Sequence, residues 1–186
     1  MTLAKTPFMT LVLGILLAFL TGCASSIQST VHQEPLDRQA RWALLPIANN
    51  TDTPQAGLSA EAMAEHQLRR RGIANLQRYP SALSRDSLFE PTERKVTEEA
   101  IKWAKDQGIR FALLGSVEEW RYKVGIDGEP AVAVTLQVLD LSTDRVIWSA
   151  SGAKSGWSRQ SMAAVAQALL TDLFGQLVLA SAISAQ

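Results

Sequence analysis

The single cysteine of this chain stands in a setting that points to lipid chemistry. Cys23 follows the small residues Thr21-Gly22 at the end of an apolar run from Phe8 to Leu20. Lys5 precedes that run, which is shorter than the ~20 residues of a membrane-spanning helix. A basic start, an apolar middle and small residues at the end are typical of a secretory signal peptide. The pattern predicts a signal peptide over residues 1–22 and a mature chain that begins at Cys23. An ordinary secretory signal and a buried free cysteine are the alternatives.

The expected modification of Cys23 would anchor the mature chain in a membrane. Leu20-Thr21-Gly22-Cys23 resembles the lipobox of bacterial lipoproteins, which implies a thioether diacylglycerol on Cys23 and an acyl chain on its new amino terminus. Two or more acyl chains hold a protein stably on a bilayer. Ala24 stands where an aspartate retains many lipoproteins in the inner membrane, so the sorting rule implies the periplasmic face of the outer membrane. No other cofactor is expected.

No set of side chains suited to catalysis or metal binding stands out. His32 and His66 are the only histidines beside the lone Cys23, too few ligands for a usual zinc cluster. The carboxylate pairs Glu98-Glu99 and Glu118-Glu119 are adjacent, and adjacent residues point apart on a helix or a strand. Neither pair by itself then forms a two-carboxylate site. We therefore expect no enzyme, no catalytic residue and no metal site.

Charge and composition limit the partners and divide the chain. The 18 Lys and Arg residues balance 18 Asp and Glu residues, so no basic field exists to bind nucleic acid. Residues 23–40, rich in Ser, Gln and charge without apolar periodicity, predict a flexible lipidated tether. The remainder, residues 41–186, has the length of a single domain. We expect it to be one α/β periplasmic domain.

The first half of that domain alternates apolar strands with amphipathic helices. The expected elements are a strand over 42–47, a helix over 56–71, a strand over 73–79, a helix that starts near Pro91 and ends at Gln107, and a central strand over 109–117. Arg69-Arg70-Arg71 before Gly72 is typical of a helix end, with an anion site as the alternative. Strands and helices at this spacing imply parallel pairing.

The second half predicts an antiparallel meander closed by a helix. Residues 118–124 continue the central strand into a turn-rich loop, and strands follow over 131–141 and 145–151. The last helix is expected to begin near Ser158, whose hydroxyl can cap it, and to bury one apolar stripe. The predicted fold is α/β: a mixed sheet with a parallel βαβαβ part, an antiparallel meander and a C-terminal amphipathic helix.

One tryptophan lies outside these elements. Trp157 falls in a loop between a strand and a helix, with Lys154 and Arg159 nearby. An exposed tryptophan beside basic residues is the composition of a membrane-interface anchor. The alternative is a tryptophan folded back on the last helix as a hydrophobic staple.

Several segments also resemble known families. The runs at 44–51, 114–117, 136–141 and 146–149 resemble a broad group of periplasmic lipoprotein domains that includes CsgG-like subunits, LpoB-type activators of peptidoglycan synthases and the TolB amino-terminal domain. The segments at 51–57, 119–125, 127–130 and 151–158 are more specifically similar to the PelC family, outer-membrane lipoproteins of Pel exopolysaccharide export.

The PelC resemblance implies an assembly and a path for a polymer. It implies a dodecameric ring whose acidic lumen guides cationic Pel polysaccharide toward the porin PelB, and a tryptophan, here Trp157, in contact with outer-membrane lipid. Asp127 and Glu129 are the candidate polymer-guiding acids, with a turn aspartate and a solvated glutamate as their structural alternatives. A monomeric LpoB-type activator is the alternative function.

Overall fold

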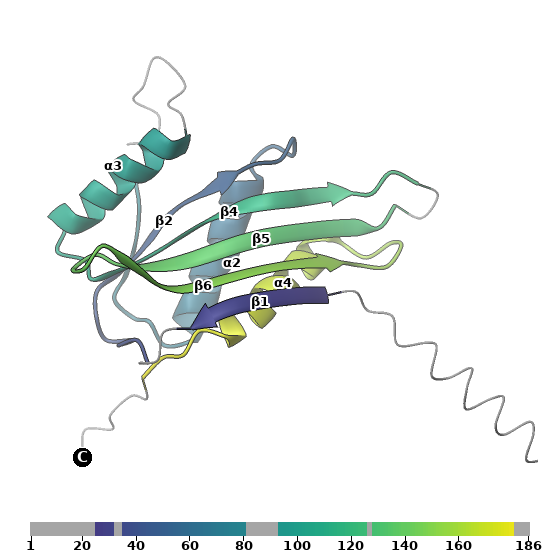
Figure 1. Cartoon of the computed structure of the whole chain (residues 1–186). Helices are drawn as coiled ribbons and strands as arrows, with labels where there is room; N and C mark the ends of the chain where they lie inside the picture. Colours follow the sequence, from purple (N-terminus) through teal and green to yellow (C-terminus); the bar gives the residue numbers. More distant parts are fainter. Residues whose placement is uncertain (1–24, 32–34, 81–92, 126–127, 181–186) are drawn as a thin grey trace, which may run out of the picture.

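A six-stranded sheet with the strand order β1-β6-β5-β4-β2-β3 forms the centre of the computed structural model (Figure 1). The structure describes residues 25–31, 35–80, 93–125 and 128–180. Its elements are β1 (Ser25–Val31), β2 (Trp42–Asn49), α2 (Ala56–Arg70), β3 (Leu76–Arg78), α3 (Glu93–Asp106), β4 (Phe111–Tyr122), β5 (Pro130–Asp140), β6 (Arg145–Ser155) and α4 (Met162–Gly175).

The pairing confirms the predicted mixed α/β fold. Strand β2 pairs in parallel with both β3 and β4, the two strands that each follow a helix-containing connection. Strands β4, β5 and β6 then pair antiparallel as a meander. The parallel part of the sheet thus lies at one edge, and the meander extends it toward β1.

The glycines that follow α2 and α3 in the sequence correctly predict where these helices end. Each helix is followed by a glycine with positive φ, 86° at Gly72 and 64° at Gly108, a conformation that glycine adopts without strain. In the arginine run, the Arg71 guanidinium donates to the Leu177 carbonyl and so fastens the end of α2 to the chain beyond α4. Burial, followed by the charges of Arg38 and Arg70, lowers the pKa of Arg71.

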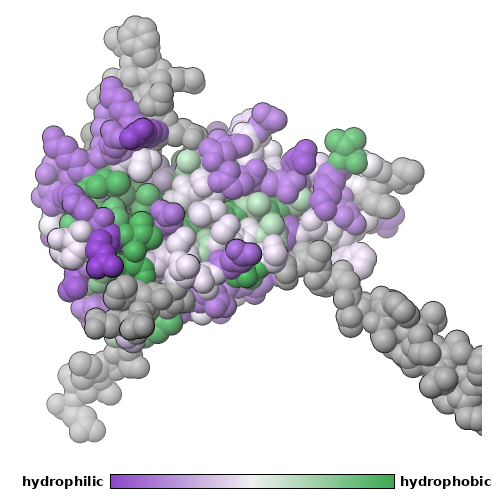
Figure 2. Space-filling model, viewed as in Figure 1, coloured by the Kyte–Doolittle hydropathy of each residue, from purple (hydrophilic) through white to green (hydrophobic). Residues whose placement is uncertain are grey.

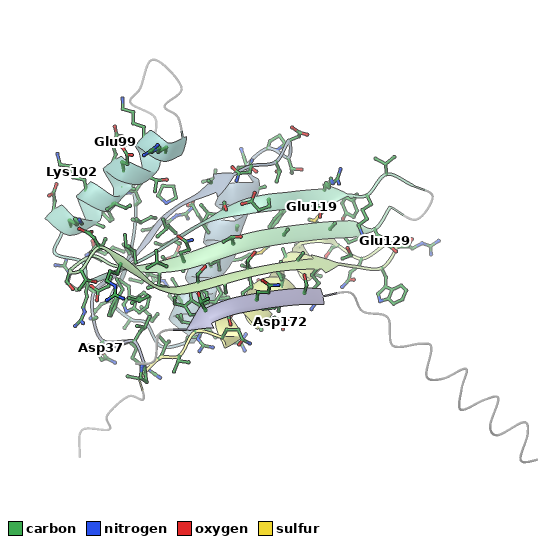
Figure 3. All side chains as sticks on the ribbon, in the orientation of Figure 1. Asp37, Glu99, Lys102, Glu119, Glu129 and Asp172 are labelled. Carbon is green, nitrogen blue, oxygen red and sulfur yellow. The ribbon has the colours of Figure 1, made fainter. Side chains whose placement is uncertain are left out.

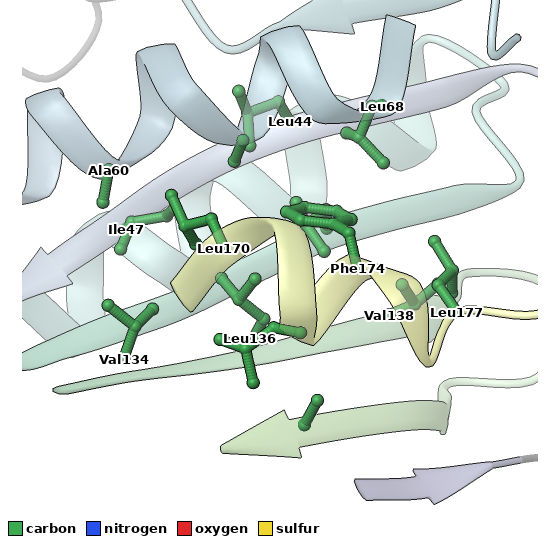
Figure 4. Packing of buried hydrophobic residues seen from close by; sticks show 14 of the residues in the cluster. Leu44, Ile47, Ala60, Leu68, Val134, Leu136, Val138, Leu170, Phe174 and Leu177 are labelled. Carbon is green, nitrogen blue, oxygen red and sulfur yellow. The ribbon is translucent and has the colours of Figure 1, made fainter. Parts of the chain in front are cut away.

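The main core lies between the sheet and the pair α2 and α4. The leucines and Phe174 of α4 interdigitate with the inward side chains of β2 and β5, as Figure 4 shows for Phe174, Leu170 and Leu136. A smaller core lies on the opposite face of β2, where Ala43 and Leu45 meet Ala100 and Ala104 of α3. Strand β2 is therefore covered on both faces, which explains its nearly continuous apolar sequence.

Helix α4 begins three residues later than predicted. Ser161, and not Ser158, is its N-cap, and the Ser161 hydroxyl accepts a hydrogen bond from the Ala164 amide at 3.2 Å. The intervening residues form a turn in which the Gln160 amide donates to the Trp157 carbonyl and Arg159 has a φ of 71°. Because Ser158 lies within this turn, its hydroxyl does not cap the helix.

The predicted flexible tether over residues 23–40 is wrong for the part that the structure describes. Ser25–Val31 forms the edge strand β1, antiparallel to β6. Further on, Leu36 is buried and bridges to Leu179. Among the residues of β1 whose side chains the structure describes, only Ile27 packs against the core, and the sequence of the strand does not alternate apolar with polar residues. Backbone pairing to β6, together with the contact of Ile27, holds β1 in place.

Candidate functional site

Two of the residues that the sequence singled out, Trp157 and Glu129, lie at one end of the sheet. Strands β4 and β6 finish there while β5 and β1 begin, because Tyr122 pairs with Pro130 and Ser25 pairs with Lys154. We call this the Trp157 end of the sheet. Trp157 and Glu129 both lie there, and Figure 3 shows Glu129 at this extremity, beyond Glu119. Cys23 and Asp127 lie outside the described residues, although Cys23 precedes Ser25 by only two positions.

Trp157 is presented to solvent by a tight loop. Its side chain is 69% exposed, so the structure does not pack it on α4. At the preceding Gly156, an added Cβ would lie 2.5 Å from a methyl carbon of Val165 and 2.9 Å from the Pro130 ring, closer than real Cβ atoms approach other atoms. The glycine lets the loop lie directly against α4 and β5. Trp157 is thereby directed away from the core.

Two further apolar side chains are exposed at the Trp157 end. Tyr122 is 51% exposed, and Val124 is fully exposed in the loop after β4. The Tyr122 hydroxyl accepts a hydrogen bond from the Met162 amide at 3.1 Å and so ties the end of β4 to the start of α4. Exposed aromatic and aliphatic side chains near Lys123 and Arg159 form the kind of surface found at membrane interfaces. The loop position of Trp157 predicts its exposure, whereas the strand expected over 118–124 gives no sign that Tyr122 and Val124 are exposed.

Glu129 is paired rather than free. Its carboxylate lies 3.7 Å from the Lys123 ammonium, which also donates to the Ser155 hydroxyl at 2.8 Å. The Lys123 amide donates to the Glu129 carbonyl at 2.7 Å. These contacts join the two arms of the β4–β5 loop, and they reduce the negative field that Glu129 projects.

An acidic cleft that the sequence did not predict lies beside the carboxyl end of β2. It is lined by the turn that follows β2 and by the second half of β4: Asn50, Thr51, Asp52, Thr53, Glu118, Glu119, Trp120, Arg121 and Ala133. A register shift between Val117 and Glu119 marks a β-bulge in β4. Bulges redirect side chains, and here both Glu118 and Glu119 line one cleft although adjacent strand residues ordinarily point apart. The bulge has no clear signal in the sequence.

Hydrogen bonds favour the charged form of Glu118, one of the carboxylates in this cleft. Glu118 accepts from the Ser116 hydroxyl at 2.5 Å and from the Asn50 side-chain amide at 3.0 Å. These two bonds, the one from Ser116 foremost, lower the pKa of Glu118. Glu119 is paired with Arg121 at 2.9 Å, whereas Asp52 is exposed on the turn. The cleft can therefore hold negative charge toward solvent.

The groups considered for catalysis are dispersed. His66 is exposed on α2, and His32 falls outside the described residues. Within residues 25–31, 35–80, 93–125 and 128–180, no three metal-ligating side chains gather into a site. In the same ranges, no helix is long and apolar enough to span a membrane.

Comparison with known proteins places this geometry in a family. No protein-family model and no curated protein matches the chain. Among solved structures, the chain is similar to a PelC dodecamer from Paraburkholderia phytofirmans, with 37% identity and a TM-score of 0.71 over 85% of this chain and 100% of that one. A variant of that PelC in a second crystal form gives 38% identity and a TM-score of 0.68 over 82% and 98% of the two chains.

A more distant structure shares only the fold. Lipoprotein GNA1162 from Neisseria meningitidis is 17% identical, with a TM-score of 0.56 over 74% of this chain and 96% of that one. The PelC likeness, by contrast, spans the whole of the solved relative at more than a third identity. The chain therefore belongs to the PelC family.

Proposed function

We propose that this chain is a non-enzymatic, outer-membrane lipoprotein subunit of Pel exopolysaccharide export. The single observation that carries the proposal is its 37% identity to a PelC dodecamer over the whole of that solved chain. In this proposal the subunits assemble into a dodecameric ring under the outer membrane. The ring guides a cationic polysaccharide toward the porin PelB.

The proposed anchor combines lipid and side chains. A diacylglycerol and an N-acyl chain on Cys23 would emerge beside the Trp157 end, because only Ala24 separates Cys23 from the first residue of β1. Trp157 would then contact outer-membrane lipid from the periplasmic side. The exposure of Trp157, Tyr122 and Val124 at the same end supports this orientation.

The proposed polymer contacts are acidic. Asp127 and Glu129 were the candidates from the sequence, and the cleft adds Glu118, whose hydrogen bonds favour its charged form. A ring repeats each carboxylate around its axis, so a cationic chain would meet the same charge many times. Glu118 is a stronger candidate than Glu129, because Lys123 offsets the charge of Glu129.

A complementation assay tests the proposal. Deletion of the gene should abolish secretion of Pel polysaccharide, and the full chain should restore it while migrating as a large oligomer. Trp157→Ala should reduce secretion with little loss of stability, because the exposed ring contributes little to the core. Secretion that is unaffected by the deletion would refute the export role, and a monomeric chain would favour the LpoB-type alternative.

A further inference from the structure

The three arginines at the end of α2 do not share one role. Arg69 pairs with Glu65 one turn earlier at 3.0 Å, as expected of a basic residue at a helix end. Arg70 is exposed, and the Arg71 guanidinium donates to the Leu177 carbonyl at 2.5 Å. Among the residues that the structure describes, neither Arg70 nor Arg71 forms an ion pair. The helix end therefore accounts for Arg69 and leaves two positive charges without a carboxylate.

A third unpaired guanidinium comes from a distant part of the chain. Arg38 lies over the turn that follows α2, where its Nη1 atom would be 3.5 Å from a Cβ placed at Gly72. Two backbone hydrogen bonds hold this segment. The Leu36 amide donates to the Val178 carbonyl at 3.0 Å, and the Ala180 amide donates to the Leu36 carbonyl at 2.9 Å. Tertiary contacts thus bring Arg38 to the end of α2.

We call Arg38, Arg70 and Arg71 the arginine cluster. After burial, the charges of Arg38 and Arg70 are the causes that lower the pKa of Arg71. The Nε atoms of Arg38 and Arg71 are buried and find no acceptor in the part of the chain that the structure describes. Buried N–H groups are ordinarily hydrogen-bonded, and neighbouring like charges destabilise each other. An anion bound to the cluster would relieve both conditions.

The arginine cluster lies at the end of the sheet opposite the Trp157 end. Trp42, Leu76 and Phe111 are the first residues of β2, β3 and β4, and they pair with one another there. The Trp42 indole donates to the Asp37 carbonyl at 3.0 Å, which places the neighbour of Arg38 beside this start of the strands. Figure 3 shows Asp37 at this extremity and Glu129 at the other.

Positive charge extends over this end of the molecule. Arg41 precedes β2, Arg110 precedes β4 and Arg145 begins β6. Arg110 lies 3.9 Å from Asp140, whereas Arg41 and Arg145 form no ion pair within the described ranges. Val178, whose carbonyl accepts from the segment of Arg38, is 46% exposed. Figure 2 shows strongly hydrophilic residues beside hydrophobic ones at this end.

We propose that the arginine cluster binds an acidic segment of a second protein. Guanidinium groups bind carboxylates through two parallel hydrogen bonds, and the surrounding arginines would steer a negative partner toward them. The exposed Val178 favours a segment in which apolar side chains stand between the carboxylates.

The inference goes beyond the proposed function and uses one part of it, the orientation of the lipid anchor. With the anchor at the Trp157 end, the arginine cluster is directed away from phospholipid headgroups and toward other periplasmic proteins. Peptidoglycan also carries carboxylates, on its stem peptides, and is the alternative that the test separates.

A titration with blocked peptides tests the proposal. The probe is a short glutamate–valine peptide with blocked ends, and the control peptide has glutamine in place of every glutamate. The full-length chain, purified in a non-ionic detergent, is titrated with each peptide by isothermal calorimetry. Arg38→Gln and Arg70→Gln each remove one charge from the cluster. Arg94→Gln removes the same charge from the exposed side of α3 and is the matched control.

The glutamate peptide should bind the wild type and Arg94→Gln equally, and the glutamine peptide should bind neither. Each cluster variant should weaken binding about tenfold, the effect of one lost hydrogen bond between charged groups. Arg38→Lys keeps the charge without the planar fork and should recover only part of the affinity. Melting temperatures check the fold of every variant. If Arg38→Gln unfolds the chain, the exposed Arg70→Gln carries the test.

No binding of the glutamate peptide, or equal losses in Arg94→Gln and the cluster variants, would overturn the proposal. Purified peptidoglycan and phosphatidylglycerol vesicles are tested in parallel by sedimentation. If either binds in an Arg38-dependent way and the peptide does not, the cluster serves the cell wall or a lipid, and the protein partner is wrong.

Failure of the proposed function is a separate result. Secretion that is unaffected by deletion of the gene would refute the export role and leave the titration unchanged. A titration that fails while the full chain restores secretion would refute only the role of the arginine cluster.

Discussion

Helices α3 and α4 are both 14 residues long, yet they differ almost completely in charge. Eight residues of α3 are charged, and α4 has one. Helix α3 buries Ala100 and Ala104 against β2, with Trp103 placed edge-on to Tyr79 at 5.4 Å between ring centroids. Helix α4 buries six residues and leaves small ones outside.

The contrast separates a helix with a charged outer side from one whose outer side carries almost no charge. A surface helix needs only one apolar stripe, and charges on the rest keep it solvated. Helix α3 follows that rule. Helix α4 has the apolar stripe without the charges, and the sheet has the same property on the side that α3 leaves open.

The two helices should differ most in how much their side chains contribute to the free energy of unfolding. Leu170→Ala in α4 removes a fully buried side chain and should cost about 2–5 kcal/mol. Ile101→Ala in α3 removes a partly buried one and should cost about 1 kcal/mol. Urea denaturation at one protein concentration, in a Cys23→Ser background, measures both. Equal losses would show that α3 is as integral to the core as α4.

Removing a charged side chain should lower the free energy of unfolding most where that side chain is buried. Glu61 of α2 accepts from the Ile47 amide and pairs with Arg78 at 2.6 Å, so Glu61→Ala should cost about 1–3 kcal/mol. The pair of Arg94 with Glu98 on α3 is exposed, and Arg94→Ala should change stability by about 0.5 kcal/mol or less. The same denaturation assay applies. A larger effect from Arg94 would contradict the view that the charges of α3 serve mainly for solvation.

The start of α4 gives a smaller and more local comparison. Ser161→Ala removes the observed cap and should cost about 1 kcal/mol. Ser158→Ala removes a loop hydroxyl three residues earlier and should stay within about 0.5 kcal/mol of wild type. Thermal unfolding of the two variants in parallel would detect the difference. If the order is reversed, the helix begins where the sequence pattern alone placed it.

The smallest expected effect on stability concerns Glu118, in the acidic cleft at the end of β4. The lowered pKa of Glu118 means that its ionised form stabilises the folded chain above the ordinary carboxyl pKa, and that this contribution is lost as the pH falls through the lowered value. The stability difference between wild type and Glu118→Gln should therefore shrink on acidification. A difference that stays constant from about pH 6 to about pH 3 would show that the Ser116 and Asn50 bonds do not discriminate charge.

The candidate site was predictable where it depended on loop chemistry. Trp157 falls between a strand and a helix, a position that is ordinarily exposed, and its side chain is exposed. The acidic cleft was not predictable. The cleft requires the β-bulge that turns Glu118 and Glu119 toward the same side, and it requires Asn50, which comes from a turn far away in the sequence. Neither feature produces a periodic pattern in the sequence.

Helices α2 and α3, the central strand and the meander can be predicted from the sequence, because periodicity and glycine stops are local properties of the chain. Strand β1, the cap of α4 and the placement of the uncharged surfaces depend instead on tertiary contacts. Strand β1 is held by the backbone of β6, and the cap depends on the turn at Trp157. The missing charges on α4 and the sheet are visible in the sequence, but only the fold shows that they lie on opposite outer sides of one subunit.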